Sequence, residues 1–243
     1  SAAPSRTSSA ARREGELWAV TVQSVDHPDV TRSFRARMLI NAAGPWVDQV
    51  LQGTLARNDV RNVRLVQGSH IVVPRLFEHD RCYIFQNNDG RIVFAIPYEG
   101  DFTLIGTTDA EHESADTRPE CTPEEAAYLC RFASAYFKRP VTEADIVWTY
   151  SGVRPLYDDG ARSATAATRD YVLSLDEAGA PLLNVFGGKI TTFRELAERG
   201  MHKLKKFFPG MGGDWTDSAP LPGGDMENAD YETFRDRMKT DYP

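Results

Sequence analysis

Short apolar stretches separated by turn residues fill the middle of the chain. β-branched and aromatic side chains recur in Val66–Val73, Cys82–Gln86, Ile92–Pro97 and Phe102–Thr107, and the intervening residues are rich in Asn, Asp and Gly. Such runs with close turn signals are typical of strands joined by hairpins. The pattern therefore predicts an antiparallel meander.

A helix is predicted after this meander. Thr122-Pro123-Glu124-Glu125 has the form of a capping box with proline in the first turn. Apolar residues then follow at helical spacing and share one face, namely Ala126, Leu129, Phe132, Ala133 and Phe137. A helix that covers one side of a sheet is the layer pattern of α+β folds.

Two strand-to-helix corners flank this region. Leu182–Phe186 is an apolar strand that runs into Gly187, Gly188 and Lys189, after which Thr191 and Thr192 can cap a helix. Ser33–Ile40 likewise runs into Asn41–Trp46, where Pro45 suits a first helical turn. Glycine lets the backbone approach a ligand, and a helix start attracts anions or carbonyl oxygens. An ordinary packing turn is the alternative at both corners, and the pattern alone leaves it open.

Further strands are predicted at Leu17–Val22, Ile146–Tyr150 and Thr168–Leu173. The residues after Pro209 are rich in Gly, Pro and Asp, and helical spacing resumes at Tyr231, Phe234 and Met238. We interpret this tail as a linker that enters another helical element.

Composition indicates a globular protein. The 243 residues, 41% of them hydrophobic, can bury a sizeable core in one large domain or two smaller ones. The net charge of −7 argues against a general affinity for nucleic acid or an anionic membrane. Cys82, Cys121 and Cys130 lack metal-ligand spacing, so they predict no metal site and indicate a reducing compartment. The sequence has no apolar run of bilayer-spanning length and no signal-peptide pattern at its start.

Four polar residues are candidates for binding or chemistry. Arg154 lies between Gly152 and Pro155 in a turn-like stretch, and Arg169 precedes a strand. Lys189 marks the start of the later helix, and His70 lies inside an apolar strand. Guanidinium groups suit a phosphate or carboxylate, and a neutral histidine can take a proton from a substrate hydroxyl. Taken singly, each has a structural alternative as a solvated or packed side chain.

Six blocks of sequence carry more information together than any one of them. They are Asn41–Trp46, Gly68–Pro74, Ile105–Asp109, Tyr150–Leu156, Thr168–Tyr171 and Phe186–Arg194. In this order they resemble the FAD-dependent glycerol-3-phosphate dehydrogenases, and the resemblance extends from about residue 11 to about residue 224. It implies oxidation of sn-glycerol 3-phosphate to dihydroxyacetone phosphate, with a hydride passing to FAD and electrons to quinone.

The resemblance also implies a fold and a set of site residues. The expected fold class is α+β, with an antiparallel-sheet substrate domain and flanking helices joined to the later part of a Rossmann-type FAD domain, as in D-amino-acid oxidases. Arg154, Arg169 and Lys189 match the substrate and phosphate contacts, and His70 lies on the substrate side of the flavin. His70, Arg154 and Lys189 are the expected catalytic residues, with His70 as the proton acceptor. The expected FAD contacts are Ala43, Gly44, Gly187, Gly188, Lys189, Ile190, Thr191 and Thr192.

The sequence also departs from the family pattern. It contains no Gly-x-Gly-x-x-Gly after an opening strand, and Ala43 stands where many relatives have threonine. We therefore expect a middle fragment, with residues 1–60 and 161–208 in the FAD domain and 61–160 in the substrate domain. Residues 209–243 are expected to form a linker and the start of a helical C-terminal domain. The isolated chain is expected to have lost tight FAD binding, and with it dehydrogenase activity.

Partners and location follow from the resemblance as well. Glycerol 3-phosphate and quinone are the expected substrate and acceptor, and the full protein is expected to be cytoplasmic, peripherally attached to the inner membrane. Sheet edges left open beside Leu39 and Val185 would favour a homodimer. Two alternatives stay open: a related oxidase that returns electrons to oxygen, and a cofactor-free anion-binding module.

Overall fold

The computed structural model describes residues 10–24, 26–57, 61–87, 89–160, 170–226 and 230–242. Internal contacts divide the chain into two units, one that ends at Lys189 and one that begins at Ile190. The candidate site residues His70, Arg154, Gly187 and Gly188 lie in the first unit.

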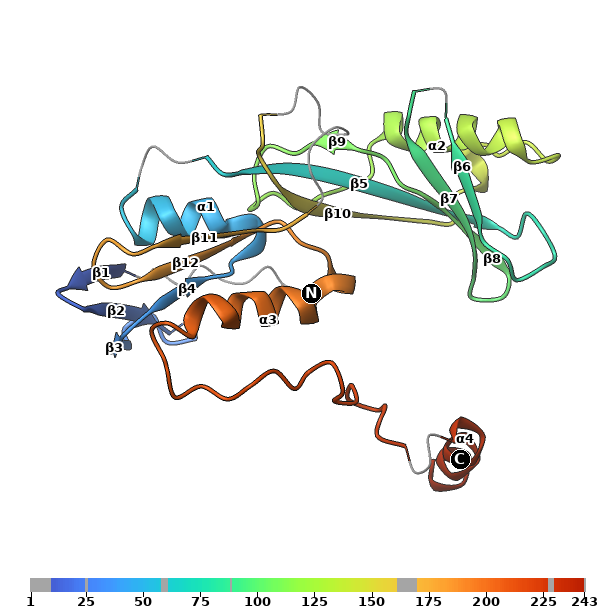
Figure 1. Ribbon diagram of the computed structural model, residues 1–243. Coiled ribbons are helices and arrows are strands. Elements are labelled where there is room, and N and C mark those ends of the chain that lie inside the picture. Colours follow the sequence, from blue (N-terminus) through green and yellow to red (C-terminus); the bar gives the residue numbers. More distant parts are fainter. Residues whose placement is uncertain are drawn as a thin grey trace. The chain divides into compact units, whose positions relative to one another are not determined.

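The first unit is built around a six-stranded antiparallel sheet (Figure 1). Its strands, in the order β10-β5-β8-β7-β6, are β10 (Trp148–Tyr157), β5 (Val63–Pro74), β8 (Phe102–Gly106), β7 (Ile92–Tyr98) and β6 (Tyr83–Gln86). The short strand β9 (Ala110–Glu111) pairs separately with β5. The predicted meander is confirmed for β6, β7 and β8, which are neighbours in chain order. The first predicted strand, Val66–Val73, lies in β5, which pairs with β8 instead of β6.

Helix α2 (Pro123–Tyr136) covers one face of this sheet. Its predicted capping box is confirmed, because Thr122 accepts from the Glu125 N–H and the Glu125 side chain accepts from the Thr122 N–H. Alternate residues of β5 face the helix, and Ile71 and Val73 are fully buried there. The main core cluster is Ile71, Val73, Val93, Ile105, Leu129, Cys130, Phe132, Ala133 and Val141. The opposite face of the sheet, on which the even-numbered residues of β5 lie, is the face that carries the candidate site.

Strand β10 is longer than the sequence pattern predicts. The predicted strand ends at Tyr150, whereas β10 continues through Arg154 to Tyr157 and pairs with β5 along its whole length. Gly152 and Pro155 argued against a strand there, but β10 is an edge strand, where a proline costs no ladder hydrogen bond on its outer side. The extension places Arg154 on the sheet rather than in a loop.

Two smaller sheets complete the first unit. One has the order β1-β2-β3, with β1 (Ala10–Glu14), β2 (Leu17–Gln23) and β3 (Thr31–Ala36) antiparallel. The other has the order β11-β12-β4, with β11 (Val172–Asp176), β12 (Leu182–Phe186) and β4 (Leu39–Asn41). β12 pairs antiparallel with β11 and parallel with β4.

These sheets correct two expectations. The single strand predicted over Ser33–Ile40 is in fact β3 and β4, which belong to different sheets, because the chain leaves one sheet and enters the next between Ala36 and Leu39. The predicted open edge at Val185 is also wrong, since β11 pairs with β12 on that side. Among the described residues, β11 and β4 are the two edge strands of this sheet, and β12 lies between them.

A second core joins the smaller sheets to the start of β5. After β4 the chain forms a 3-10 turn η1 (Gly44–Trp46), the short helix α1 (Val47–Gln49) and a π-helical turn η2 (Val50–Thr54). The cluster contains Ala11, Trp18, Val47, Leu51, Val63, Ala180, Leu182 and Phe186. The Asp48 carboxylate accepts from the backbone N–H groups of Asn62 and Val63, at 2.7 and 3.0 Å, and so fixes α1 against the first residue of β5.

The second unit begins with the 3-10 turn η4 (Ile190–Thr192), followed by α3 (Phe193–Leu204) and, after a linker, α4 (Tyr231–Asp241). Thr192 occupies the N-cap position of α3, as predicted, but its side chain makes no capping hydrogen bond. Within the described ranges, no helix has the length and apolar content needed to cross a membrane. A short 3-10 turn precedes the helix at both strand-to-helix corners, η1 before α1 and η4 before α3.

Candidate functional site

A row of residues crosses four strands on the sheet face opposite α2. Phe94 of β7 pairs with Gly106 of β8, Gly106 pairs with His70 of β5, and His70 pairs with Tyr150 of β10. The His70 and Tyr150 rings are stacked, with 4.6 Å between centroids and 5° between planes. A Cβ atom at position 106 would overlap the imidazole, so glycine provides the space in which the ring lies.

Burial and a neighbouring cation keep His70 neutral. Burial of the ring, together with the smaller effect of the Arg154 charge, lowers the pKa of His70 to about 4. Its Nδ1 is buried, and none of the described residues forms a hydrogen bond with it. A neutral imidazole offers one donor and one acceptor nitrogen, so it suits recognition of a hydroxyl group.

Arg154 lies on the same sheet face, four residues beyond Tyr150. Its Nη2 donates to the Thr107 hydroxyl at 3.0 Å, and its Nη1 donates to the Asp109 carboxylate at 3.3 Å. A Cβ atom at Gly68 would overlap the guanidinium group and the Thr107 hydroxyl. The half-buried guanidinium therefore lies in a slot formed by Gly68, Thr107 and Asp109, and its planar fork suits two oxygens of a phosphate.

The parallel strands β4 and β12 both end in glycine turns. Gly44 has a φ of 56°, and Gly187 and Gly188 have φ values of 72° and 100°. A Cβ at Gly187 would lie 2.8 Å from the Asp170 carbonyl oxygen, so both the conformation and the space require glycine. A Cβ at Gly44 would meet no atom within 4 Å, which shows open space beside that turn. The carboxyl ends of neighbouring parallel strands are where dinucleotides bind in sheets of this kind.

The same strand ends carry a buried acceptor without a partner. Asn41 of β4 donates through Nδ2 to the Val47 carbonyl at 3.0 Å and to the Asn184 side chain at 3.2 Å. Asn41 Oδ1 is buried and accepts no hydrogen bond from the described residues. Buried polar atoms are normally satisfied, so this oxygen and the two glycine turns fit a bound polar group such as FAD. Ala43, Gly44, Gly187 and Gly188 are the residues of this unit that would hold it.

The glycine turn after β12 lies beside the end of β10. The rings of Tyr157 and Phe186 are 5.8 Å apart, and a Cβ at Gly187 would lie 3.6 Å from the Pro155 carbonyl oxygen. Arg154 immediately precedes Pro155 in β10. The strand that carries Arg154 therefore passes beside the glycine turn.

The structure brings together some of the predicted site residues. His70 and Arg154 share the sheet face, and Gly187 is adjacent to the strand that carries Arg154. Lys189 follows the glycine turn with an exposed side chain. Ile190, Thr191 and Thr192 form η4 in the second unit, and Arg169 lies outside the described residues.

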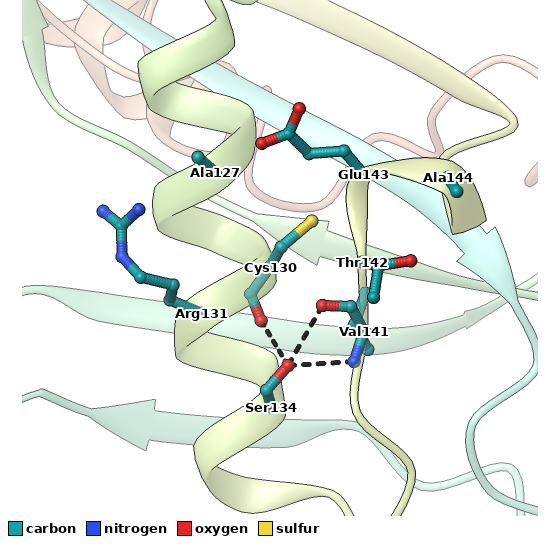
Figure 2. Close-up of a pocket in the computed structure, with 8 residues that line it drawn as sticks. All are labelled: Ala127, Cys130, Arg131, Ser134, Val141, Thr142, Glu143 and Ala144. Carbon is teal, nitrogen blue, oxygen red and sulfur yellow. Dashed lines mark hydrogen bonds between the residues drawn. The ribbon is translucent and has the colours of Figure 1, made fainter.

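A depression beside α2 is a poorer candidate for a binding site (Figure 2). It lies between α2 and the segment 141–144, where the Ser134 hydroxyl bonds the Cys130 and Val141 carbonyls and the Val141 N–H at 2.8 to 3.0 Å. Burial raises the pKa of the Cys130 thiol to about 11, with smaller contributions from Glu143 and Asp145, which disfavours the nucleophilic thiolate. These groups hold the segment to α2 and do not converge on a ligand.

Comparison with known proteins agrees with this geometry. The sequence profile of the family described as FAD dependent oxidoreductase matches residues 5–194. The chain belongs to this family. The antiparallel sheet next to a parallel strand pair is the α+β architecture expected from the sequence.

Within the family, the chain is similar to dehydrogenases of phosphorylated polyols. It is 53% identical to the D-erythritol 1-phosphate dehydrogenase of Brucella abortus, over 96% of this chain and 46% of that protein. It is 48% identical to the glycerol-3-phosphate dehydrogenase of Pseudomonas aeruginosa, over 89% of this chain and 42% of that protein. The structure of the Bacillus halodurans glycerol-3-phosphate dehydrogenase complexed with FAD superposes with a TM-score of 0.74 at 26% identity, over 95% of this chain and 44% of that one. The chain thus spans less than half the length of these relatives.

Several residues of the site were absent from the sequence prediction. Thr107 and Asp109 contact Arg154, and Tyr150 stacks on His70, although all three lie within blocks that carry the family resemblance. Gly68 and Gly106 were the available signal, because an isolated glycine inside an apolar strand indicates that another group approaches the backbone closely.

Proposed function

We propose that this chain forms the substrate-binding part of an enzyme that oxidises sn-glycerol 3-phosphate to dihydroxyacetone phosphate, with quinone as the final electron acceptor. The observation that carries the proposal is the placement of Arg154 and His70 on one face of the sheet. The names of the similar proteins support the choice of a phosphorylated polyol as substrate.

Each residue has a separate role in this proposal. Arg154 binds the phosphate through paired charge-assisted hydrogen bonds, which orients the carbinol carbon. His70 accepts a hydrogen bond from the hydroxyl group that is oxidised, and takes its proton. FAD, when bound, accepts the hydride from the carbinol carbon. Lys189 and Arg169 are proposed as further phosphate contacts, with Lys189 next to the Gly187–Gly188 turn.

The weak basicity of His70 in the absence of substrate agrees with this assignment. Burial is the larger cause that lowers the pKa of His70, and the Arg154 charge is the smaller one. A phosphate dianion bound to Arg154 offsets that positive charge, so substrate binding raises the proton affinity of the imidazole. His70 therefore becomes a better proton acceptor when the substrate is in place.

D-erythritol 1-phosphate is a second candidate substrate. The specific observation in its favour is the 53% identity to the Brucella abortus enzyme, against 48% and 45% for two glycerol-3-phosphate dehydrogenases. Both compounds have a phosphate and a neighbouring secondary alcohol, so both suit Arg154 and His70. The two substrates differ in the length of the carbon chain on the side away from the phosphate, so the residues that contact that part of the substrate decide between them.

Turnover of a substrate panel by the full-length protein tests the proposal. Initial rates with glycerol 3-phosphate, D-erythritol 1-phosphate, glycerol and erythritol are compared, with a soluble quinone analogue as acceptor. We expect a high kcat/KM for one phosphorylated polyol and little turnover of the unphosphorylated ones. Arg154→Lys keeps the charge but loses the fork, and should lower kcat/KM about ten- to hundredfold. Equal rates with and without the phosphate group would refute the role of Arg154, and oxygen consumption in place of quinone reduction would refute the acceptor.

A further inference from the structure

A layer of buried polar side chains lies directly beneath the candidate site. Gln67 and Ser69 of β5 point to the α2 side of the sheet, and Thr108 follows β8. Glu125 reaches this layer from the first turn of α2. All four are buried, in a place where the rest of the sheet is covered by apolar side chains. Burial of so many polar groups is costly unless each is bonded, so their partners define what the layer does.

Glu125 is the centre of the layer. One carboxylate oxygen accepts from Gln67 Nε2 at 2.9 Å and from the Thr122 N–H at 3.0 Å, and the other accepts from the Thr108 hydroxyl. All of these partners are donors, as an ionised carboxylate requires, and the N-terminus of α2 favours its negative charge. Capping of the helix uses only the first oxygen, so the bond to Thr108 serves a different purpose.

That purpose is visible in the bonds that Thr108 makes. Its hydroxyl accepts from the Ser69 N–H at 2.9 Å, and its N–H donates to the Ser69 carbonyl at 3.3 Å. Its carbonyl accepts from the Thr107 hydroxyl at 3.1 Å. The same Thr107 hydroxyl accepts from Arg154 at 3.0 Å. Thr108 therefore connects Glu125, bonded to its side chain, with the Thr107 hydroxyl, bonded to its carbonyl, and so with the guanidinium group.

The positions of these residues along the chain strengthen the link. Thr108 lies between Thr107 and Asp109, the two residues that contact Arg154. Because the Thr108 side chain is held in place, the backbone of the adjacent residues Thr107 and Asp109 is held in place as well. Thr108 is fully buried and bonded to both β5 and α2, whereas Thr107 and Asp109 are less buried.

We propose that Glu125 is a positioning residue for substrate binding: through Thr108 it fixes the segment Thr107–Asp109, which in turn holds the Arg154 guanidinium in its slot. The proposal rests on the proposed function of Arg154 as the phosphate-binding group. Glu125 itself touches no substrate. Its effect is on the affinity for the phosphorylated end of the substrate.

Kinetics of the full-length protein with two variants and two controls test this. Glu125→Gln cannot accept hydrogen bonds at its amide nitrogen. Thr108→Val removes the link between Glu125 and the segment, together with the bond that the Thr108 hydroxyl accepts from the Ser69 N–H. Both should raise the KM for the phosphorylated polyol about ten- to hundredfold, the effect of displacing a positioned group. Competitive inhibition by inorganic phosphate should weaken by the same factor, and kcat should change less. The KM of the double variant should be no higher than that of Thr108→Val alone, because Glu125 acts on the segment through the Thr108 hydroxyl.

The controls separate positioning from stability. Glu124→Gln removes an exposed charge from the same helix turn, and Thr122→Ala removes the capping hydroxyl while Thr108 keeps its partner. Thr122→Ala should lower the melting temperature but leave KM within about twofold, since a cap contributes to stability and not to Arg154. A normal KM and phosphate inhibition constant in a folded Thr108→Val variant would overturn the proposal. If the unaltered protein oxidised no phosphorylated polyol, the proposed function would fail instead, and the two failures are therefore distinguishable.

Discussion

Acidification should destabilise this protein through His70, and the size of the effect follows from its surroundings. The pKa of His70 in the folded chain is about 4, against an ordinary value of about 6.5. Between these values the unfolded chain binds one proton more than the folded chain, so stability is lost as the pH falls from about 6.5 towards 4. At pH 5 the full shift would cost about 2 kcal/mol, which we reduce to about 1 kcal/mol because the ring is partly exposed.

A matched variant isolates this contribution from the other groups that titrate. The free energy of unfolding is measured by urea denaturation at pH 7 and pH 5 for the unaltered protein and for His70→Gln. The unaltered protein should lose about 1 kcal/mol more than the variant over this interval. Tyr150→Ala, which uncovers the ring, should lie between the two, whereas Tyr150→Phe keeps the stacked ring and should behave as the unaltered protein. Equal losses for the unaltered protein and His70→Gln would refute the burial of a neutral imidazole.

Two further predictions concern the arginine slot and the cysteines. Gly68→Ala should displace the Arg154 guanidinium and raise the KM for the phosphorylated substrate about tenfold or more. Gly152→Ala is the control, because Gly152 is paired with Gly68 and a Cβ there meets no atom within 4 Å, so KM should be unchanged. Steady-state kinetics of both variants test this prediction. Equal KM values for the two variants would contradict the claim that Gly68 leaves the space for the Arg154 guanidinium. Cys82 is exposed and should react quickly with iodoacetamide, but Cys130, buried and with its pKa raised to about 11, should react only after unfolding. Mass spectrometry of the modified peptides checks the order of reaction.

Much of the fold could be predicted because its elements obey local rules. The strands of the meander have the turn chemistry of hairpins, and α2 has its capping box and one apolar face. The errors occur where tertiary context decides. β10 continues past Gly152 and Pro155 because it is an edge strand that pairs with β5, and Ser33–Ile40 divides because its two ends join different sheets.

The site itself depends on pairs that no local pattern contains. His70 and Tyr150 are 80 positions apart in the sequence and meet only through the β5–β10 register. Thr107 reaches Arg154 by the same kind of long-range pairing. A sequence shows that glycines interrupt two apolar strands, but not which ring or guanidinium group occupies the space they leave. The family resemblance identified His70 and Arg154 as candidates, and the sheet register supplies the physical reason why they lie near each other.

The most direct test of the account is anaerobic reduction of the flavin in the full-length protein loaded with FAD. Addition of glycerol 3-phosphate or D-erythritol 1-phosphate should bleach the visible absorbance of the flavin, and the same polyols without phosphate should not. Arg154→Lys should require a much higher concentration of the phosphorylated polyol for the same bleaching. A flavin that stays oxidised with every phosphorylated polyol, or that is bleached by an amino acid instead, would contradict the account.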